Sequence, residues 1–287
     1  MGHMNVQFYL AKADEGLSTL AAGLGLSPRA RGSDRATLVP REQHIRFHRE
    51  LRPGAPFAVQ AGILLAKSEG LIVYEEMQNI ATGTVAATFV TRAEWADTTV
   101  RGGGLPLPIG AVAKAAPLLI DLPAHGQPRG LELPPARPAP SLDEAEQLGL
   151  MTTLRGAVLR EHCDAHGYML PRHYMGRVSD AIPNLIAQTR GEDRSTSTTG
   201  GAALEYRLVY RTPAREGDLL ILKSGLRVVS SKTYIWCHWL FDAESGDCFA
   251  TAEAVAIAMD LTTRKAIEIP PAMREQLERL VVPGLSV

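Results

Sequence analysis

A single internal repeat constrains this chain of 287 residues more than any other feature. Gly2, Met4, Tyr9 and Glu15 recur 165 positions later as Gly167, Met169, Tyr174 and Asp180. Two later turns repeat as well, since 52–54 and 82–83 match 215–217 and 245–246 at a shift of 163. A nearly constant shift over some 80 residues predicts two copies of one folding unit.

Each copy has the pattern of a loop, one long helix and a run of antiparallel strands. In the first copy, apolar residues at helical spacing predict a helix over 5–24, and Asn5 is a favourable N-cap. Alternation around Ile45 predicts a half-buried strand, and further strands are expected over 57–67, 71–80 and 85–91. The second copy predicts a strand over 154–161, a helix over 171–188 containing Pro183, and strands over 203–211, 218–229, 233–241 and 247–259.

A different composition separates the copies. Nine prolines fall between 106 and 140, after a run of three glycines at 102–104. This stretch predicts an extended crossover linker, with one short helix over 109–120. We therefore divide the chain into a first unit (1–95), a linker (96–150), a second unit (151–268) and a C-terminal helix and tail (269–287).

The overall composition excludes several classes of function. The formal net charge is −1 and no basic run stands out, so nothing favours binding to nucleic acid or an anionic membrane. No apolar run is long enough to span a membrane, and no leader segment is recognisable. The three cysteines fit neither a zinc site nor a disulfide framework, which predicts reduced thiols and a cytoplasmic protein.

The loop motif resembles that of the hotdog-fold thioesterases, both the 4-hydroxybenzoyl-CoA thioesterase-like family and the acyl-ACP thioesterases. Asp164, Gly167 and Tyr174 have the spacing of that family's Asp-x-x-Gly loop and helix Tyr. The acyl-ACP branch adds a His, Asn, Tyr and Glu, and the first copy keeps all four as His3, Asn5, Tyr9 and Glu15. The second copy departs from this pattern with Tyr168, Leu170 and Asp180.

The resemblance implies an α+β double hotdog, in which each of two tandem units wraps an antiparallel sheet around a long central helix. It implies catalysis between the units, with Asp164 near Glu15, and His3 and Asn5 near Asp180. Gly2, Gly167, Tyr168, Tyr9 and Tyr174 would contact the substrate. Because two units can pair within one chain, both a monomer and a homodimer fit.

The first loop has no Asp before its Gly, because the chain begins inside the motif. We expect a gene start placed too late, a shortened chain or a degenerate first half. Gly2, His3 and Met4 could instead be a cloning remnant, although the match continues into Asn5, Tyr9 and Glu15.

Each candidate residue also has a purely structural interpretation. Asp164 could only shape a turn, and Asn5 could only cap its helix. Glu15 and Asp180 could lie on solvated helix faces, and His3 could be disordered near the terminus. Tyr9 and Tyr174 could be core residues.

Three functions remain open. The first is hydrolysis of an acyl-CoA or acyl-ACP thioester, in which a carboxylate acts as base or nucleophile and helix N–H groups stabilise the oxyanion. The second is a hotdog hydratase, whose Asp-x-Asn-Pro-x-His signature is absent. The third is a non-catalytic acyl-binding or scaffold protein of the same fold. No metal or cofactor is implied, since the sequence has neither a ligand cluster nor a phosphate-binding glycine loop.

Overall fold

The structure is a computed structural model that describes residues 2–26, 34–190 and 198–287. The first unit contains α1 (Val6–Gly23), β1 (Ala36–Phe47), β2 (Phe57–Lys67), β3 (Gly70–Asn79) and β4 (Thr84–Asp97). The second contains β6 (Met151–Ala157), α4 (Pro171–Arg190), β7 (Thr199–Tyr210), β8 (Leu219–Val229), β9 (Thr233–Asp242) and β10 (Cys248–Asp260). Between them lie β5 (Gly104–Leu105), α2 (Ile109–Ala115) and α3 (Leu142–Gln147), and α5 (Pro271–Glu278) follows β10.

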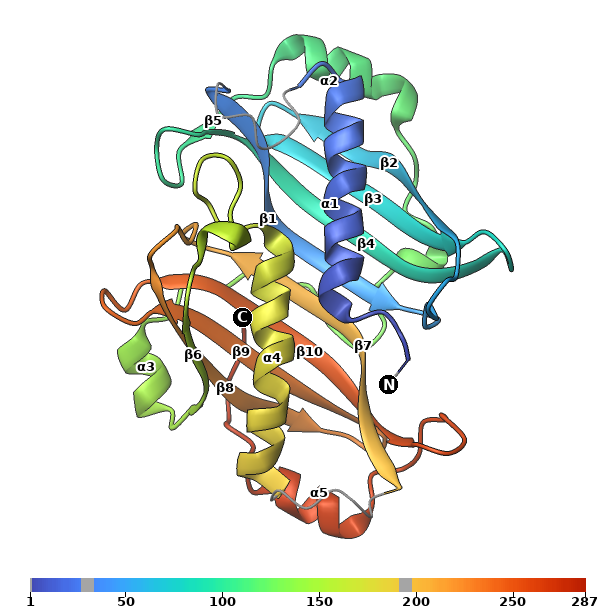
Figure 1. Cartoon of the computed structure of the whole chain (residues 1–287), viewed down its shortest axis with the longest axis vertical. Coiled ribbons are helices and arrows are strands. Elements are labelled where there is room, and N and C mark those ends of the chain that lie inside the picture. Colours follow the sequence, from blue (N-terminus) through green and yellow to red (C-terminus); the bar gives the residue numbers. More distant parts are fainter. Residues whose placement is uncertain (1, 27–33, 191–197) are drawn as a thin grey trace.

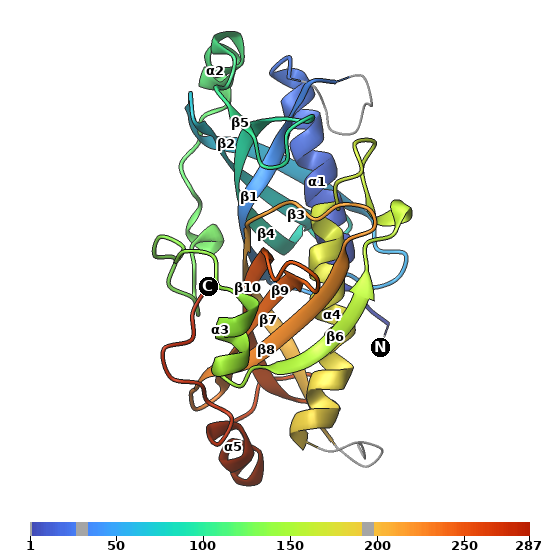
Figure 2. The same cartoon turned by 90° about the vertical axis from the view of Figure 1, so that its left-hand side faces the viewer.

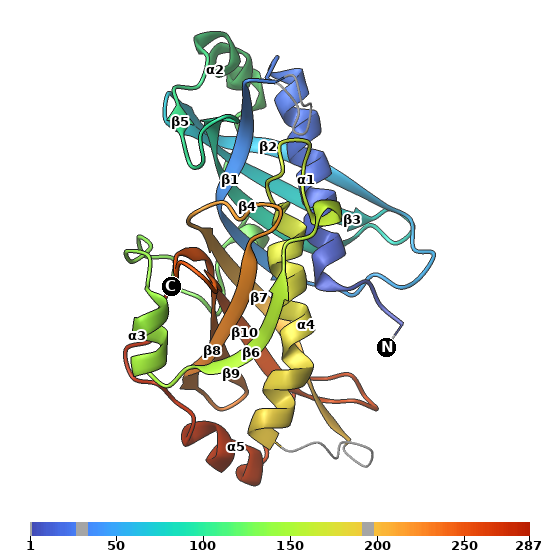
Figure 3. The ribbon, with the colours of Figure 1, turned by 60° about the vertical axis from the view of Figure 1, so that its left-hand side comes forward.

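One antiparallel sheet runs through both units in the order β2-β3-β4-β1-β7-β10-β9-β8-β6, with β5 added to β4. The units join where β1 pairs with β7, from Glu42 opposite Val209 to Arg46 opposite Glu205. At the far edge of the second unit, β6 runs alongside α4 (Figure 3). This arrangement confirms the predicted double hotdog.

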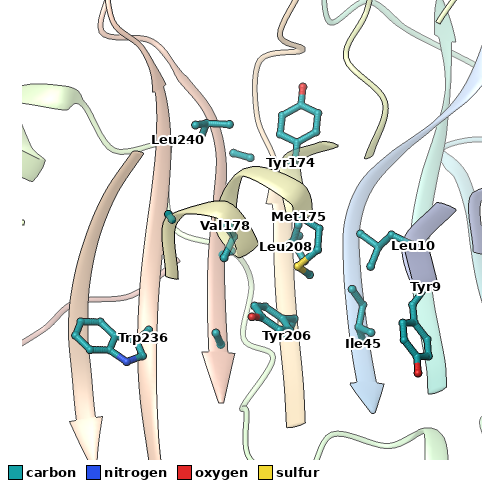
Figure 4. Close-up of a cluster of buried hydrophobic side chains, with 14 of the residues drawn as sticks. Tyr9, Leu10, Ile45, Tyr174, Met175, Val178, Tyr206, Leu208, Trp236 and Leu240 are labelled. Carbon is teal, nitrogen blue, oxygen red and sulfur yellow. The ribbon is translucent and has the colours of Figure 1, made fainter. Parts of the chain in front are cut away.

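The two long helices cover the same face of the sheet and run in opposite directions, with their N-terminal halves side by side (Figure 1). Asn5 begins α1 as predicted, because its side-chain oxygen accepts the N–H of Gln7 at 3.0 Å. The Asn5 amide also donates to Ser179 Oγ on α4 at 3.1 Å. The inner faces of both helices pack into one core on the sheet (Figure 4). No helix in the described ranges combines the length and apolarity that crossing a bilayer requires.

The predicted repeat is visible in the hydrogen bonds as a pseudo-two-fold relation. The N–H of Leu51 donates to the Tyr9 hydroxyl at 2.9 Å, and the N–H of Ala214 donates to the Tyr174 hydroxyl at the same distance. The two hydroxyls point in opposite directions, as such a relation requires (Figure 4). Both tyrosines are buried, which supports their structural interpretation.

Each unit also sends an arginine to the other unit. Arg101, after β4, donates to the carbonyl of Pro213 and to Asp218, both at 2.8 Å. Its counterpart at a shift of 163 is Arg264, after β10, which pairs with Glu50. Two related clamps therefore hold the units together beside the strand junction.

The opposite face of the sheet carries two polar side-chain contacts at the junction. Arg207 Nε lies 2.8 Å from Glu42 Oε1, and His44 Nε2 lies 2.6 Å from Glu205 Oε1. The linker covers these contacts on the side away from the helices (Figure 2), where Arg207 also donates to the Pro134 carbonyl. The first strand was predicted to be half-buried, but His44 on its polar face is buried because β7 and the linker enclose it.

Some boundaries differ from the predictions. The linker contains α2, α3 and short 3₁₀ turns, so it is less extended than its prolines suggested. The first strand of the second unit ends at Ala157 rather than at 161, because a 3₁₀ turn follows at Arg160–His162. The His162 ring accepts the N–H of Leu159 at 2.9 Å and so closes that turn.

Each unit buries one titratable side chain under its helix at related positions. Glu75 on β3 is fully buried beneath Gly16 of α1, and its counterpart at a shift of 163 is His238 on β9. Burial, reinforced by the nearby charge of Asp14, raises the pKa of Glu75 well above its usual value. Burial lowers the pKa of His238 to about 4.

We expect Glu75→Gln to stabilise the protein increasingly as the pH rises. Because the folded-state pKa of Glu75 is raised, its contribution is complete below the unfolded-state pKa and is lost as the pH rises through the folded-state value. Thermal unfolding should show little difference from the parent at pH 4. At pH 8 the variant's midpoint should be higher, by about 2–4 °C for each 1 kcal/mol gained. Glu244→Gln, at an exposed turn, serves as the control, and a pH-independent difference would contradict this prediction.

Candidate active site between the two units

A narrow cavity of about 70 Å³ lies where the two units diverge on one side of the β1–β7 junction. The second unit contributes the loop around Asp164, the start of α4 and the segment after β7. The first unit contributes the beginning of β1 and the end of β4 with the turn that follows it. The resemblance implied a site between the units, and this cavity occupies such a place.

Asp164 lines this cavity and also shapes its own loop. Its Oδ1 accepts the N–H groups of His166 and Tyr168 at 2.9 and 3.0 Å, and its carbonyl accepts the N–H of Gly167 at 3.1 Å. Among the described residues no donor reaches Oδ2. The turn-forming role is therefore present, and it leaves one carboxylate oxygen available for chemistry.

Most N–H groups of this loop are already used. Those of His166 to Leu170 all donate within the protein, Pro171 has none, and that of His173 donates to the Leu170 carbonyl. Within this stretch only the Arg172 N–H lacks an acceptor in the described chain. Arg172 lines the separate pocket around His162 and not the cavity around Asp164, so this N–H does not serve a ligand in the cavity.

The neighbours of Asp164 hold the loop in place. The Tyr168 hydroxyl accepts from Arg215 at 3.2 Å, and the Arg215 guanidinium lies 4.7 Å from the Tyr168 ring centre. Tyr168 and Tyr174 both line the cavity, and burial raises the pKa of Tyr174. Burial likewise raises the pKa of the Cys163 thiol to about 11, so Cys163 is a poor nucleophile near neutral pH.

The candidate residues of the first loop lie outside this cavity. Gly2 has a φ of 65°, matching 79° at Gly167, so both loops need a glycine here. His3 Nδ1 lies 3.9 Å from Glu50 Oε1, in the cluster that also contains Arg264. Asn5 contacts the residue before Asp180, close to where the resemblance placed it.

Glu15 and Asp180 occupy exposed helix faces. Glu15 pairs with Lys12 at 2.7 Å, and Asp180 pairs with Arg177 at 3.8 Å. Lys12 and Arg177 are themselves related by the shift of 165, so the repeated acids belong to repeated ion pairs. Glu15 does not line the cavity around Asp164, and Asp180 lines a separate pocket with Gln7 and His162. The structure therefore does not bring Glu15 together with Asp164 at this cavity.

Thr37 and Arg211 are among the cavity residues that the sequence interpretation missed. Thr37 Oγ1 and Arg211 Nε are both buried without a hydrogen-bond partner. The position of Arg211 at the end of the strand predicted over 203–211, at the place of His48 in the first unit, was the available signal. Thr37 lies outside the alternation around Ile45 that predicted its strand, so the sequence offered no signal for it. Elsewhere in the described chain, no group of three His, Cys, Asp or Glu residues is placed to hold a metal ion.

Sequence comparison shows similarity to known thioesterases. The family model described as the thioesterase-like superfamily matches residues 1–139 and 158–277. The long-chain acyl-CoA thioesterase FadM of Escherichia coli is 33% identical over 72 residues, which make up 25% of this chain and 54% of FadM. The chain thus spans about half the length of that curated relative.

Structure comparison extends the similarity to nearly the whole chain. The 12:0-ACP thioesterase from Umbellularia californica is 14% identical with a TM-score of 0.63, over 89% of this chain and 88% of that one. An acyl-ACP thioesterase from Bacteroides thetaiotaomicron is 12% identical with a TM-score of 0.64, over 89% and 90%. At these identities the likeness shows the shared fold.

Proposed function

The chain belongs to the thioesterase-like superfamily, and on that premise we propose that it hydrolyses an acyl-CoA or acyl-ACP thioester. The observation that carries the proposal is the cavity between the units, which brings together the Asp164 carboxylate and the start of α4. A carboxylate with one free oxygen beside a helix N-terminus suits attack on a carbonyl carbon.

In the proposed reaction, Asp164 accepts a proton from water while the water oxygen attacks the thioester carbonyl carbon. The N-terminal end of α4, which borders the cavity at Pro171, stabilises the negative charge that develops on the carbonyl oxygen. The carbon–sulfur bond then breaks, and the proton held by Asp164 passes to the leaving thiolate. The products are a carboxylic acid and a free thiol. Attack by Asp164 itself, through an anhydride that water hydrolyses, would give the same products.

One observation favours a second function, an acyl-binding protein without turnover. Asp164 Oδ1 is fully engaged in shaping its loop, and a carboxylate could be retained for that reason alone.

A thiol-release assay distinguishes the two functions. The full chain should be tested with short, long and aromatic acyl-CoAs and with acyl-ACP. We expect release above the enzyme-free rate for at least one of them, inhibited by the thioether analogue of that substrate. Tight binding of such analogues without turnover of any thioester would refute the hydrolase and support the acyl-binding protein.

A further inference from the structure

Arg211 is a partly buried cation without a counter-ion at the wall of the cavity. Its Nη2 reaches Thr251 Oγ1 at 3.5 Å, a long contact, and its Nε has no partner. No carboxylate in the described parts of the chain forms an ion pair with it. A guanidinium stays charged in a protein, so withdrawing it from water without a partner is costly.

The charges around Arg211 do not compensate for it. The pKa of Arg211 is lowered, and desolvation by burial is the largest cause. Arg207 and Arg137 also lower this pKa, whereas Cys248 and Glu42 raise it. Glu42 is already bound to Arg207 at 2.8 Å. Arg137 has its own carboxylate partner, Glu144, at 2.6 Å. The Arg207–Glu42 and Arg137–Glu144 pairs are each neutral. Together with Arg211 they therefore carry one surplus positive charge, which lies on Arg211.

The other charged residues of the cavity wall have a partner in the protein or a proposed catalytic role. Arg41 is bound to Glu94 at 2.8 Å, and Asp97 Oδ1 accepts the N–H and hydroxyl of Thr99. Asp164 is the proposed base. An unpaired guanidinium on a cavity wall calls for a ligand that brings acceptor oxygens.

The size of the cavity limits that ligand. One water-sized group needs about 10–15 Å³ on this measure, so about 70 Å³ holds on the order of five such groups. A long alkyl chain does not fit, and the core of the first unit beneath α1 is closed by packed side chains and the buried Glu75.

We propose that the cavity selects a short acyl group ending in a carboxylate, such as a succinyl or glutaryl group, which Arg211 binds. This inference rests on the proposed thioester hydrolysis and names its substrate class. Arg211 pairs with the terminal carboxylate, and the thioester carbon lies toward Asp164.

The test compares acyl groups matched in length. The full chain should be assayed with succinyl-CoA and glutaryl-CoA against butyryl-CoA and pentanoyl-CoA. We expect kcat/KM to favour the dicarboxylic members by on the order of 10- to 100-fold, as a hydrogen bond to a charged group gives. In Arg211→Gln the ratio of kcat/KM between the two classes should approach one, because KM for the dicarboxylic substrates rises. Arg211→Lys should retain part of the preference. The thermal unfolding midpoint of Arg211→Gln should not fall, because this variant removes an unpaired charge.

Several results would overturn the proposal. They are equal kcat/KM for the matched pairs, an unchanged preference in Arg211→Gln, or a parallel loss of kcat on both classes. The last would place Arg211 at the thioester carbonyl. If no thioester is hydrolysed, calorimetric titration with the thioether analogues of succinyl-CoA and butyryl-CoA tests carboxylate binding at the cavity separately. Tighter binding of the carboxylated analogue, lost in Arg211→Gln, supports the site even though hydrolysis fails, and equal binding refutes it.

Discussion

Asp164→Asn should lower thiol release from a hydrolysed acyl-CoA by about 10²–10⁴-fold, the usual contribution of a positioned general base. The amide cannot accept a proton from water or attack the carbonyl carbon. It keeps an oxygen in the place of Oδ1, which can still accept the N–H groups of His166 and Tyr168. Loop geometry and thermal unfolding should therefore change little, and kcat should fall more than KM rises.

Two further variants separate the chemical role of Asp164 from its structural one. Asp164→Ala removes the turn oxygen as well, so it should lose stability by about 1 kcal/mol in addition to activity. Asp242→Asn is the matched control, because Asp242 Oδ1 accepts the N–H of Glu244 at 2.9 Å in the same local geometry outside the cavity. That variant should keep the parent rate. Full activity in Asp164→Asn would mean that the carboxylate only shapes its turn.

Arg207→Met should lower the free energy of unfolding by about 3 kcal/mol, as expected when a buried ion pair loses one partner. The Arg207 side chain is 2% exposed, so its removal leaves Glu42 beside the junction without its counter-ion. The carbonyl of Pro134 loses a donor as well. Glu42 is 23% exposed and can regain some water, which keeps the expected loss at the lower end of the range for buried pairs.

Urea unfolding of three variants tests this prediction. In Glu42→Gln/Arg207→Met both charges are gone, so part of the stability should return. Arg279→Met breaks an exposed pair with Glu275 on α5 and should cost less than about 1 kcal/mol. Equal small losses in Arg207→Met and Arg279→Met would show that the junction does not depend on the buried pair.

The repeat predicted most of the fold because it reflects local patterns. Helical spacing and Asn5 located α1, and alternation located the strands. The shifts of 165 and 163 correspond to related contacts of Tyr9 and Tyr174 with the backbone. Helical spacing and strand alternation depend on residues close in sequence, which periodicity reports directly.

The candidate site was harder to predict because it depends on long-range placement. Thr37 and Arg211 line one cavity only because β1 and β7 diverge beyond a short paired stretch. The acids Glu15 and Asp180 were repeated and so favoured catalysis, yet the repeated feature is an ion pair on an exposed helix face. The burial of His44 depended on the linker folding over the sheet, which no local pattern reports.

The pseudo-two-fold relation has a consequence for how such a chain can change over generations. In a homodimer of identical units every substitution occurs at two places at once, so both must tolerate it. Here each half is encoded separately and can vary alone. Positions related by the shift of 163 already differ, since Glu75 corresponds to His238 and Glu50 corresponds to Pro213. One loop borders an open cavity while its counterpart lies beside an ionic cluster. Fusion thus allows one loop to border a cavity while its counterpart takes part in holding the halves together.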